Sequence, residues 1–159
     1  MIAINNLTKK MDFGRAEELL RFALSDHPLV DVTLNVTESD KTLDRLSAPG
    51  YELQALIYPT GSPHSYNLIV RTRPDTSLEV LMFHESVHLC QFESGKLGVD
   101  MKSGKYTWNG EEYPADFPYL SRPWEKEAIN GQAALSKEWN AMKKSVCRVR
   151  KRLFGKNAK

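Results

Sequence analysis

Long apolar runs are missing from this 159-residue sequence. No segment approaches the roughly 18 consecutive apolar residues that span a membrane. The first ten residues also lack the apolar core of a secretory signal. These absences argue against a membrane protein and predict a protein that stays in the cytoplasm in which it is made.

Cysteine is equally scarce. The two cysteines, Cys90 and Cys147, are far apart, and neither belongs to a CxxC pair. This excludes a zinc knuckle and a CxxC redox motif, and both residues are expected to be plain thiols. Internal repeats are also lacking, and the length suits one hydrophobic core without disulfide support.

Acidic side chains are absent from the end of the chain. Residues 143–159 carry eight of the 22 Lys and Arg residues, which leaves 14 basic and 20 acidic side chains in residues 1–142. We therefore expect one domain over 1–142 and a basic helix end or tail over 143–159. That segment is either simply solvated or a contact for an acidic partner or nucleic acid, although it has no base-reading motif.

Three segments have the pattern of strands. Residues 30–36 alternate apolar and polar side chains, which indicates a half-buried strand. Residues 51–58 and 65–72 are further candidates, and the turn residues between them favour a hairpin. Residues 37–50 are expected to form a loop.

Helical periodicity marks three other segments. The first helix is expected from Asp12 to about Ser25. A second should begin at the capping-box pattern Thr76-Ser77-Leu78-Glu79 and end near Gly95. Residues 96–118 suggest a loop or loose hairpin, and a last helix should open at Arg122-Pro123. Its expected buried stripe comprises Trp124, Ala128, Leu135, Trp139 and Met142. The elements together predict an α+β domain.

The second helix contains an HExxH motif, His84-Glu85-Ser86-Val87-His88. Histidines four residues apart lie on one helix face, so both rings can reach one tetrahedral metal ion. Glu85 lies beside that position and can exchange a proton with a metal-activated water. Apolar neighbours indicate that the helix is buried: Leu78, Leu81, Met82, Leu89 and Phe92.

A catalytic zinc ion needs a third protein ligand. His27, His64 and Asp100 are possible, but Glu125 and Glu127 at the start of the last helix are better placed. The two glutamates are about 200° apart around a helix, so only one can face the metal.

The segment His84–Gln91, followed by Tyr119–Ala128 (YLSRPWEKEA), resembles the gluzincins. In particular, it resembles the small minigluzincin-like metallopeptidases of phage and bacterial genomes. The resemblance covers roughly residues 50–140. It implies a minimal zincin-like domain, with a small, mostly antiparallel sheet packed on an active-site helix and a C-terminal glutamate-bearing helix. By analogy with zincin folds, it also implies that the third strand, residues 65–72, presents an edge that binds an extended peptide.

The same resemblance implies one catalytic Zn²⁺ on His84, His88 and Glu125, with Glu127 as the alternative ligand. The expected function is peptide-bond hydrolysis by metal-activated water, with Glu85 as general base and acid. Many gluzincins have an Asp where this chain has Ile129, so support for the ligand histidines must come from elsewhere.

Further site residues remain open at this stage. Tyr119 and Arg122 are candidates for stabilising the oxyanion, although a surface or carboxylate-pairing role for Arg122 is the alternative. Gln91 lies on the ligand face and either lines the cleft or sits at its polar rim. Aromatic residues of the 96–118 segment either wall the cleft or cap the core: Tyr106, Trp108 and Tyr113.

A second function is compatible with the same residues. The chain is then a catalytically silent zincin-fold interaction or virion-associated protein that binds through its basic tail. For the peptidase, the expected partner is a peptide or protein substrate. A phage-encoded protein of either kind would act in the host cytoplasm. Oligomeric state is left open by the sequence.

Overall fold

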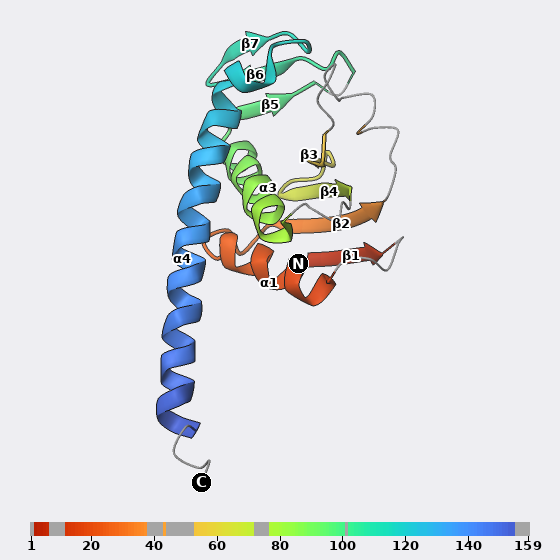
Figure 1. The fold of residues 1–159 in the computed structure, drawn as a ribbon. Helices are drawn as coiled ribbons and strands as arrows, with labels where there is room; N and C mark the ends of the chain where they lie inside the picture. Colours follow the sequence, from red (N-terminus) through yellow and green to blue (C-terminus); the bar gives the residue numbers. More distant parts are fainter. Residues whose placement is uncertain are drawn as a thin grey trace.

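The computed structural model describes residues 2–6, 12–37, 43, 53–71, 77–100 and 102–154. A four-stranded sheet is covered on one face by two helices, and a third, longer helix lies against them (Figure 1). A smaller three-stranded sheet lies at one end of that long helix. The arrangement is α+β, as the order of elements predicted.

The larger sheet has the strand order β1-β2-β4-β3. Its strands are β1 (Ile2–Asn6), β2 (Asp31–Thr37), β3 (Ala55–Pro59) and β4 (Ser65–Arg71). β1 pairs parallel with β2, and β2 pairs parallel with β4. The prediction of a mostly antiparallel sheet is therefore wrong for the four-stranded sheet. The sequence pattern did not reveal β1, and parallel neighbours need a crossover, which helix α1 (Phe13–Ala23) provides.

The third expected strand is β4, and it lies inside the sheet rather than at its edge. Leu68, Ile69 and Val70 are all buried, as expected for a strand that is covered on both faces. The expected hairpin is confirmed, because β3 runs antiparallel to β4. The edge beside this hairpin therefore belongs to β3.

The two helices on the sheet begin at side-chain caps. Asp12 accepts a hydrogen bond from the backbone of Arg15 at the start of α1. Ser77 accepts one from Val80 at the start of α3 (Leu78–Glu93). The expected cap at Thr76 lies outside the described residues, as does most of the expected 37–50 loop. Gly95 ends α3 with a positive φ of 70°, which favours glycine.

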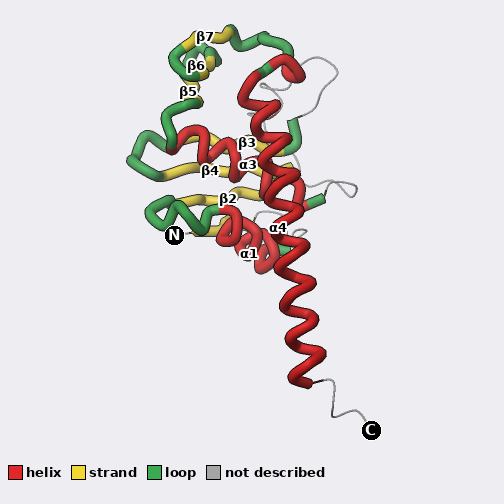
Figure 2. Tube along the Cα trace, turned by 90° about the vertical axis from the view of Figure 1, so that its left-hand side faces the viewer, coloured by secondary structure: helices red, strands yellow, loops and turns green. Residues whose placement is uncertain are grey.

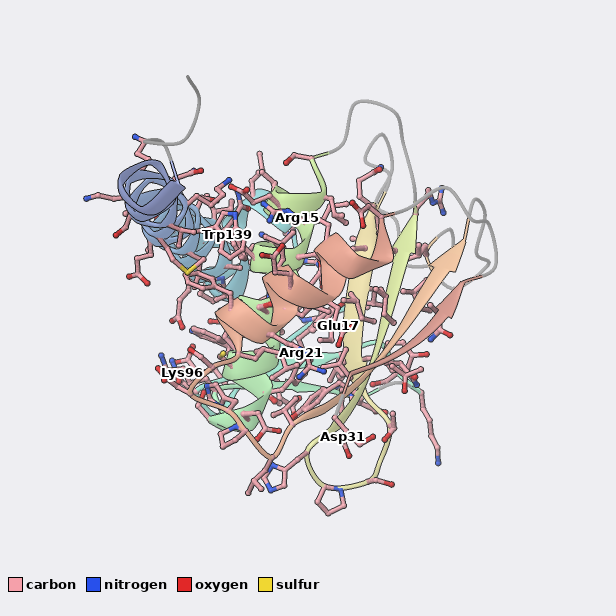
Figure 3. The ribbon with its side chains drawn as sticks, turned by 90° about the horizontal axis from the view of Figure 1, so that it is seen from below. Arg15, Glu17, Arg21, Asp31, Lys96 and Trp139 are labelled. Carbon is pink, nitrogen blue, oxygen red and sulfur yellow. The ribbon has the colours of Figure 1, made fainter. Side chains whose placement is uncertain are left out.

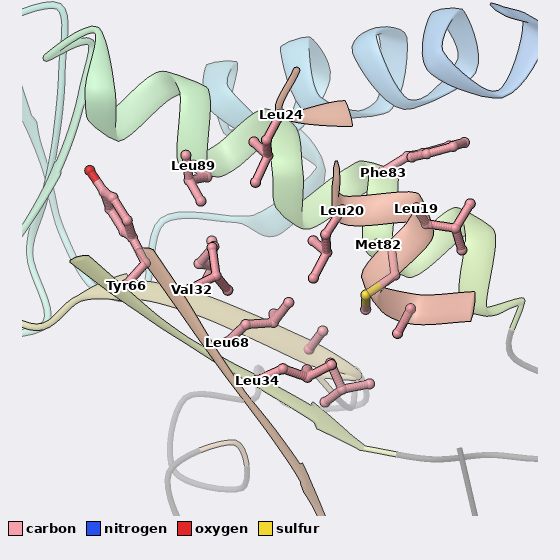
Figure 4. Close-up of a cluster of buried hydrophobic side chains, with 14 of the residues drawn as sticks. Leu19, Leu20, Leu24, Val32, Leu34, Tyr66, Leu68, Met82, Phe83 and Leu89 are labelled. Carbon is pink, nitrogen blue, oxygen red and sulfur yellow. The ribbon is translucent and has the colours of Figure 1, made fainter. Parts of the chain in front are cut away.

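A single apolar core lies between the sheet and these helices (Figure 4). Leucines of α1 meet Val32, Leu34 and Leu68 of the sheet, and α3 contributes Met82 and Leu89. Each fully buried side chain of this size stabilises the fold by about 1.5–3 kcal/mol. This packing fixes α3, and with it the HExxH motif, on the sheet.

Residues 97–113 contain a second, antiparallel sheet, where the sequence left an ordered loop or a loose hairpin open. Its strands are β5 (Leu97–Val99), β6 (Tyr106–Trp108) and β7 (Glu111–Tyr113). Leu97 and Trp108 pack on Trp124 to form a small hydrophobic cluster. The expected hairpin is present, with one more strand than the pattern indicated.

The last helix, α4 (Pro123–Phe154), joins both clusters, because Trp124 belongs to the small one and Trp139 to the main core. Figure 3 shows Arg15 of α1 beside Trp139, with its guanidinium carbon 4.5 Å from the ring centroid. Met142 is 39% exposed, so the expected buried stripe ends before it. Beyond this point α4 projects past the rest of the molecule (Figures 1 and 2).

No helix among the described residues combines the length and apolar character of a bilayer-crossing segment.

Candidate metal centre

Helices α3 and α4 bring three ligand-type side chains together. His84 Nε2 lies 3.2 Å from Glu125 Oε2, and His88 Nε2 lies 3.4 Å from the same oxygen. The two imidazole nitrogens are 3.1 Å apart. Within the described part of the chain, these residues form a group that could hold a metal ion.

The size of this triangle fits a tetrahedral ion. With metal–ligand bonds of about 2.0–2.1 Å, neighbouring ligand atoms of a tetrahedron are about 3.3–3.4 Å apart. Three protein ligands also leave one coordination position open, as in catalytic zinc sites. His84, His88 and Glu125 are at most 14% exposed at their side chains. The donor set therefore fits the ion that the motif implies.

Gln91 orients the His88 ring through a hydrogen bond. Its amide nitrogen donates to the Trp124 carbonyl at 3.0 Å, so its amide oxygen faces His88 Nδ1 at 2.8 Å. His88 must then carry a proton on Nδ1, which leaves Nε2 as the metal-facing atom in the neutral ring. Gln91 is only 1% exposed, so its expected place in the cleft or at its rim is wrong. Its spacing from His88 was visible in the sequence, but its partner on α4 was not.

Glu85 lies in the same buried region as the ligands. Burial raises the pKa of its carboxyl group, against the lowering effect of His88 and His84. The backbone N–H of Ile57, on strand β3, donates a hydrogen bond to it. A raised pKa gives this carboxyl group a higher proton affinity than an ordinary glutamate, which suits a general base.

Glu125 and His88 form a coupled pair. Burial alone would raise the pKa of Glu125, but hydrogen bonds from His84 and His88 lower it well below its ordinary value. Burial alone would lower the pKa of His88, but the hydrogen bond and charge of Glu125 raise it to about 9. Without metal, the pair is therefore a carboxylate and an imidazolium at neutral pH.

The other proposed ligands lie elsewhere. Glu127 is 3.2 Å from Lys96 Nζ and is 42% exposed at its side chain. His64 contacts Glu93 at 2.7 Å, and Asp100 accepts a hydrogen bond from Ser103. Of the two glutamates left open by the sequence, Glu125 is therefore the one beside the imidazoles.

Tyr119 and Arg122 lie just before α4 and line the same cleft. A hydrogen bond from Tyr119 contributes to the lowered pKa of Glu125. Arg122 donates to the carbonyl oxygens of Phe117 and Ala115 at 3.0 and 3.3 Å. Within the described residues, Arg122 therefore pairs with backbone carbonyl groups, and the expected carboxylate pairing is wrong. Its guanidinium also lies 5.1 Å from the Tyr106 ring centroid.

A cleft of about 360 Å³ opens above the ligands, between β3, α3 and the start of α4. Three exposed apolar residues line it, each from a different element: Val80 (40% exposed), Leu120 (76%) and Ile129 (46%). Tyr106 lines the cleft and also stacks on Trp124, with ring centroids 5.0 Å apart. Trp108 and Tyr113 pack against Trp124 without lining the cleft. Tyr106 thus combines the two expected roles, and the other two aromatic residues only cap the core.

Among the described strands, β3 is the outermost next to this cleft, and Ala55, Leu56 and Ile57 line it. Gln54 and Thr60 hydrogen-bond to β4 through Arg71 and Ser65, so the alternate residues Ala55 and Ile57 direct their backbone groups away from β4. Ile57 uses its N–H to bind Glu85. The remaining backbone groups of this edge are placed to pair with an extended chain.

Comparison of the chain with protein-family models, curated proteins and solved structures gave no match.

Proposed function

We propose that this protein is a zinc-dependent metallopeptidase that cleaves peptide bonds in the cleft beside β3. One observation carries the proposal. Two histidines and a glutamate from separate helices converge on one point, with a buried glutamate of raised pKa beside them. The resemblance of the motif to gluzincins supports the same activity.

His84, His88 and Glu125 would hold the ion. When bound, zinc supplies Lewis acidity, which polarises a substrate carbonyl and makes a water molecule more acidic. Glu85 accepts a proton from that water and then donates it to the leaving amine, and burial maintains the proton affinity that both steps need. Tyr119 lines the cleft and donates a hydrogen bond to Glu125, so its phenol would orient this ligand beside the position of a developing oxyanion.

An extended peptide suits the cleft better than a compact small molecule. The alternate backbone groups of β3 offer strand pairing, and the exposed apolar residues at the cleft offer contacts for side chains. The substrate strand therefore pairs with β3, and not with β4 as the sequence suggested.

The test combines elemental analysis with cleavage of a defined peptide mixture followed by mass spectrometry. Wild-type protein should contain about one zinc per chain and cleave peptides. Glu85→Gln should keep the metal and lose activity by about 10²–10⁴-fold, the usual contribution of a general base. His84→Ala and Glu125→Gln should lose both metal and activity.

Glu127→Gln is the matched control. It makes the same chemical change two residues away, on a side chain that pairs with Lys96, so metal and activity should remain. Full cleavage by Glu85→Gln would overturn the mechanism. A metal-loaded wild-type protein that cleaves nothing would favour the silent interaction protein instead.

A further inference from the structure

An apolar stripe in the sequence continues into the projecting end of α4, and its members Met142 and Val146 are exposed. We name residues 144–154 the overhang. Just before this segment, Lys143 forms an ion pair with Glu79 of α3 at 3.5 Å. Lys144, Ser145 and Val146 are all exposed, and Val146 is exposed by 52%. Figures 1 and 2 both show the helix leaving the body here.

The stripe continues the one that anchors α4 to the core. Apolar residues recur at alternating steps of four and three, first in the packed part and then in the overhang: Leu135, Trp139, Met142, Val146, Val149 and Leu153. This is the a/d pattern of a helix–helix seam. Trp139 is 1% exposed, whereas Met142 is 39% exposed. The same stripe is thus buried at Trp139 and exposed at Met142 and Val146.

The a/d positions favour a helix as the occupant because they continue a surface that already packs on helices. At 100° per residue, the four positions from Met142 to Leu153 fall within an arc of about 60°, although Cys147 and Phe154 widen the apolar side of the overhang to about 160°. Trp139 of the same stripe packs on Phe22 of α1 and Phe83 of α3, and a further helix would extend that packing. A bilayer surface is the competing occupant, and vesicle binding tests it.

Charge decides which helix. In the overhang, the positions that flank the seam are basic, with Arg150 on one side and Arg152 on the other, whereas Lys143 already pairs with Glu79. After Glu138 the chain has no acidic residue to balance them. A second copy of this chain would place like charges beside like charges, which is unfavourable. Nucleic acid would use the charges but would leave the apolar stripe without a contact.

We propose that the overhang is a docking site for an acidic amphipathic helix of another protein, which pairs its apolar residues with Met142, Val146 and the positions that follow. Such a partner satisfies both features at once. Its apolar residues cover the open seam, and its acidic residues pair with the flanking Lys and Arg side chains.

The test uses the full chain and synthetic 21-residue helical peptides, with binding measured by fluorescence anisotropy. One peptide has Leu at its a/d positions and Glu at its e/g positions. A second keeps the glutamates but has Ser at a/d, and a third keeps Leu but has Lys at e/g. The first should bind at least tenfold more tightly than either control, and more weakly as salt increases.

Variants locate the site. Val146→Glu should reduce binding of the first peptide at least tenfold, and so should the charge reversal Arg150→Glu. Lys137→Glu makes a comparable reversal at an exposed position of α4 within the body, so it should bind as the wild type does. Circular dichroism and zinc content should be the same in all three variants.

Each other result overturns the proposal. Equal binding of the Leu-containing and Ser-containing acidic peptides would mean charge attraction alone. Tighter binding to duplex DNA or to phosphatidylserine vesicles, or dimerisation lost in Val146→Glu, would assign the seam to another occupant. Absence of binding to any probe would leave the stripe without a partner.

Discussion

Gln91 connects the two helices that carry the candidate metal ligands. It connects His88 on α3 to the Trp124 carbonyl on α4, next to Glu125. An outer hydrogen bond of this kind fixes the tautomer and direction of a ligand histidine. The amide therefore takes the supporting role that is often played by a carboxylate.

Replacing Gln91 by Met keeps the volume and removes both hydrogen bonds. We expect zinc affinity to fall by about 10–100-fold, as is usual when such a partner of a ligand histidine is lost. Competition with a chromophoric chelator measures it. Asn140→Met, at an exposed position of α4, is the control and should bind zinc normally. Unchanged affinity in Gln91→Met would contradict the proposed role.

His88 makes metal binding depend on pH. Without metal, its pKa is raised to about 9, so at pH 7 the ring is protonated, and zinc must displace that proton. We expect release of about one proton per zinc at pH 7, and an affinity that rises about tenfold per unit between pH 6 and 8. Calorimetry in buffers with different ionisation enthalpies measures the release. A binding enthalpy that does not vary with the buffer would contradict the shift.

The same shift affects the metal-free fold in the opposite direction. Because the pKa of His88 is raised on folding, its stabilising contribution is complete below about pH 6.5, the unfolded value, and is lost as the pH rises through about 9. The metal-free fold therefore gains most from His88 at low pH, whereas zinc affinity rises as the pH increases toward about 9.

At the scale of the elements, the crossing of α3 and α4 determines whether the ligands meet. Gly131 of α4 faces Val87 of α3, and an added Cβ there would lie 2.7 Å from a Val87 methyl carbon. The absence of a side chain thus lets the helices approach closely. Their distance in turn sets how near Glu125 lies to the imidazoles.

Gly131→Ala tests this arrangement. Helix propensity alone would stabilise the variant by up to about 1 kcal/mol. We expect instead a loss of about 1–3 kcal/mol from overpacking, together with weaker zinc binding. Adding Val87→Ala should recover much of both losses, because it removes the methyl groups in the way. Greater stability with unchanged zinc affinity in the single variant would rule out this spacing role.

The sequence predicted the elements better than their arrangement. The HExxH helix, its apolar neighbours and the opening of α4 at Pro123 follow from local periodicity and capping, which a single segment carries. Parallel pairing of β1 with β2 depends on contacts between distant segments. The choice between Glu125 and Glu127 likewise depended on how α4 is rotated against α3, and Lys96 on another element pairs with the second of them.

For the whole molecule, the ligand cluster lies where two hydrophobic clusters meet. Trp124 of the small cluster precedes Glu125 in sequence, and Phe92 packs against both clusters. A metal ion at this place would cross-link α3 and α4. Its removal should therefore affect global stability and not only activity.

We expect zinc at 100 times its dissociation constant to stabilise the fold by about 2.7 kcal/mol. For a chain of this size, that corresponds to an increase of about 5–11 °C in Tm. Differential scanning calorimetry with zinc and with a chelator measures the difference. His84→Ala should unfold at the same temperature in both. An equal wild-type Tm with zinc and with the chelator would argue against a metal ion between the helices.

The unbroken course of α4 also sets a distance between its two ends. Glu125 and Val146 are separated by about 32 Å at 1.5 Å per residue. A protein anchored at the overhang would leave the cleft free, and about ten extended residues of its own chain would span the gap. Such tethering would raise the effective concentration of that chain at the cleft to about the millimolar range. Selection of a substrate would then depend on the anchor as much as on the residues around the scissile bond.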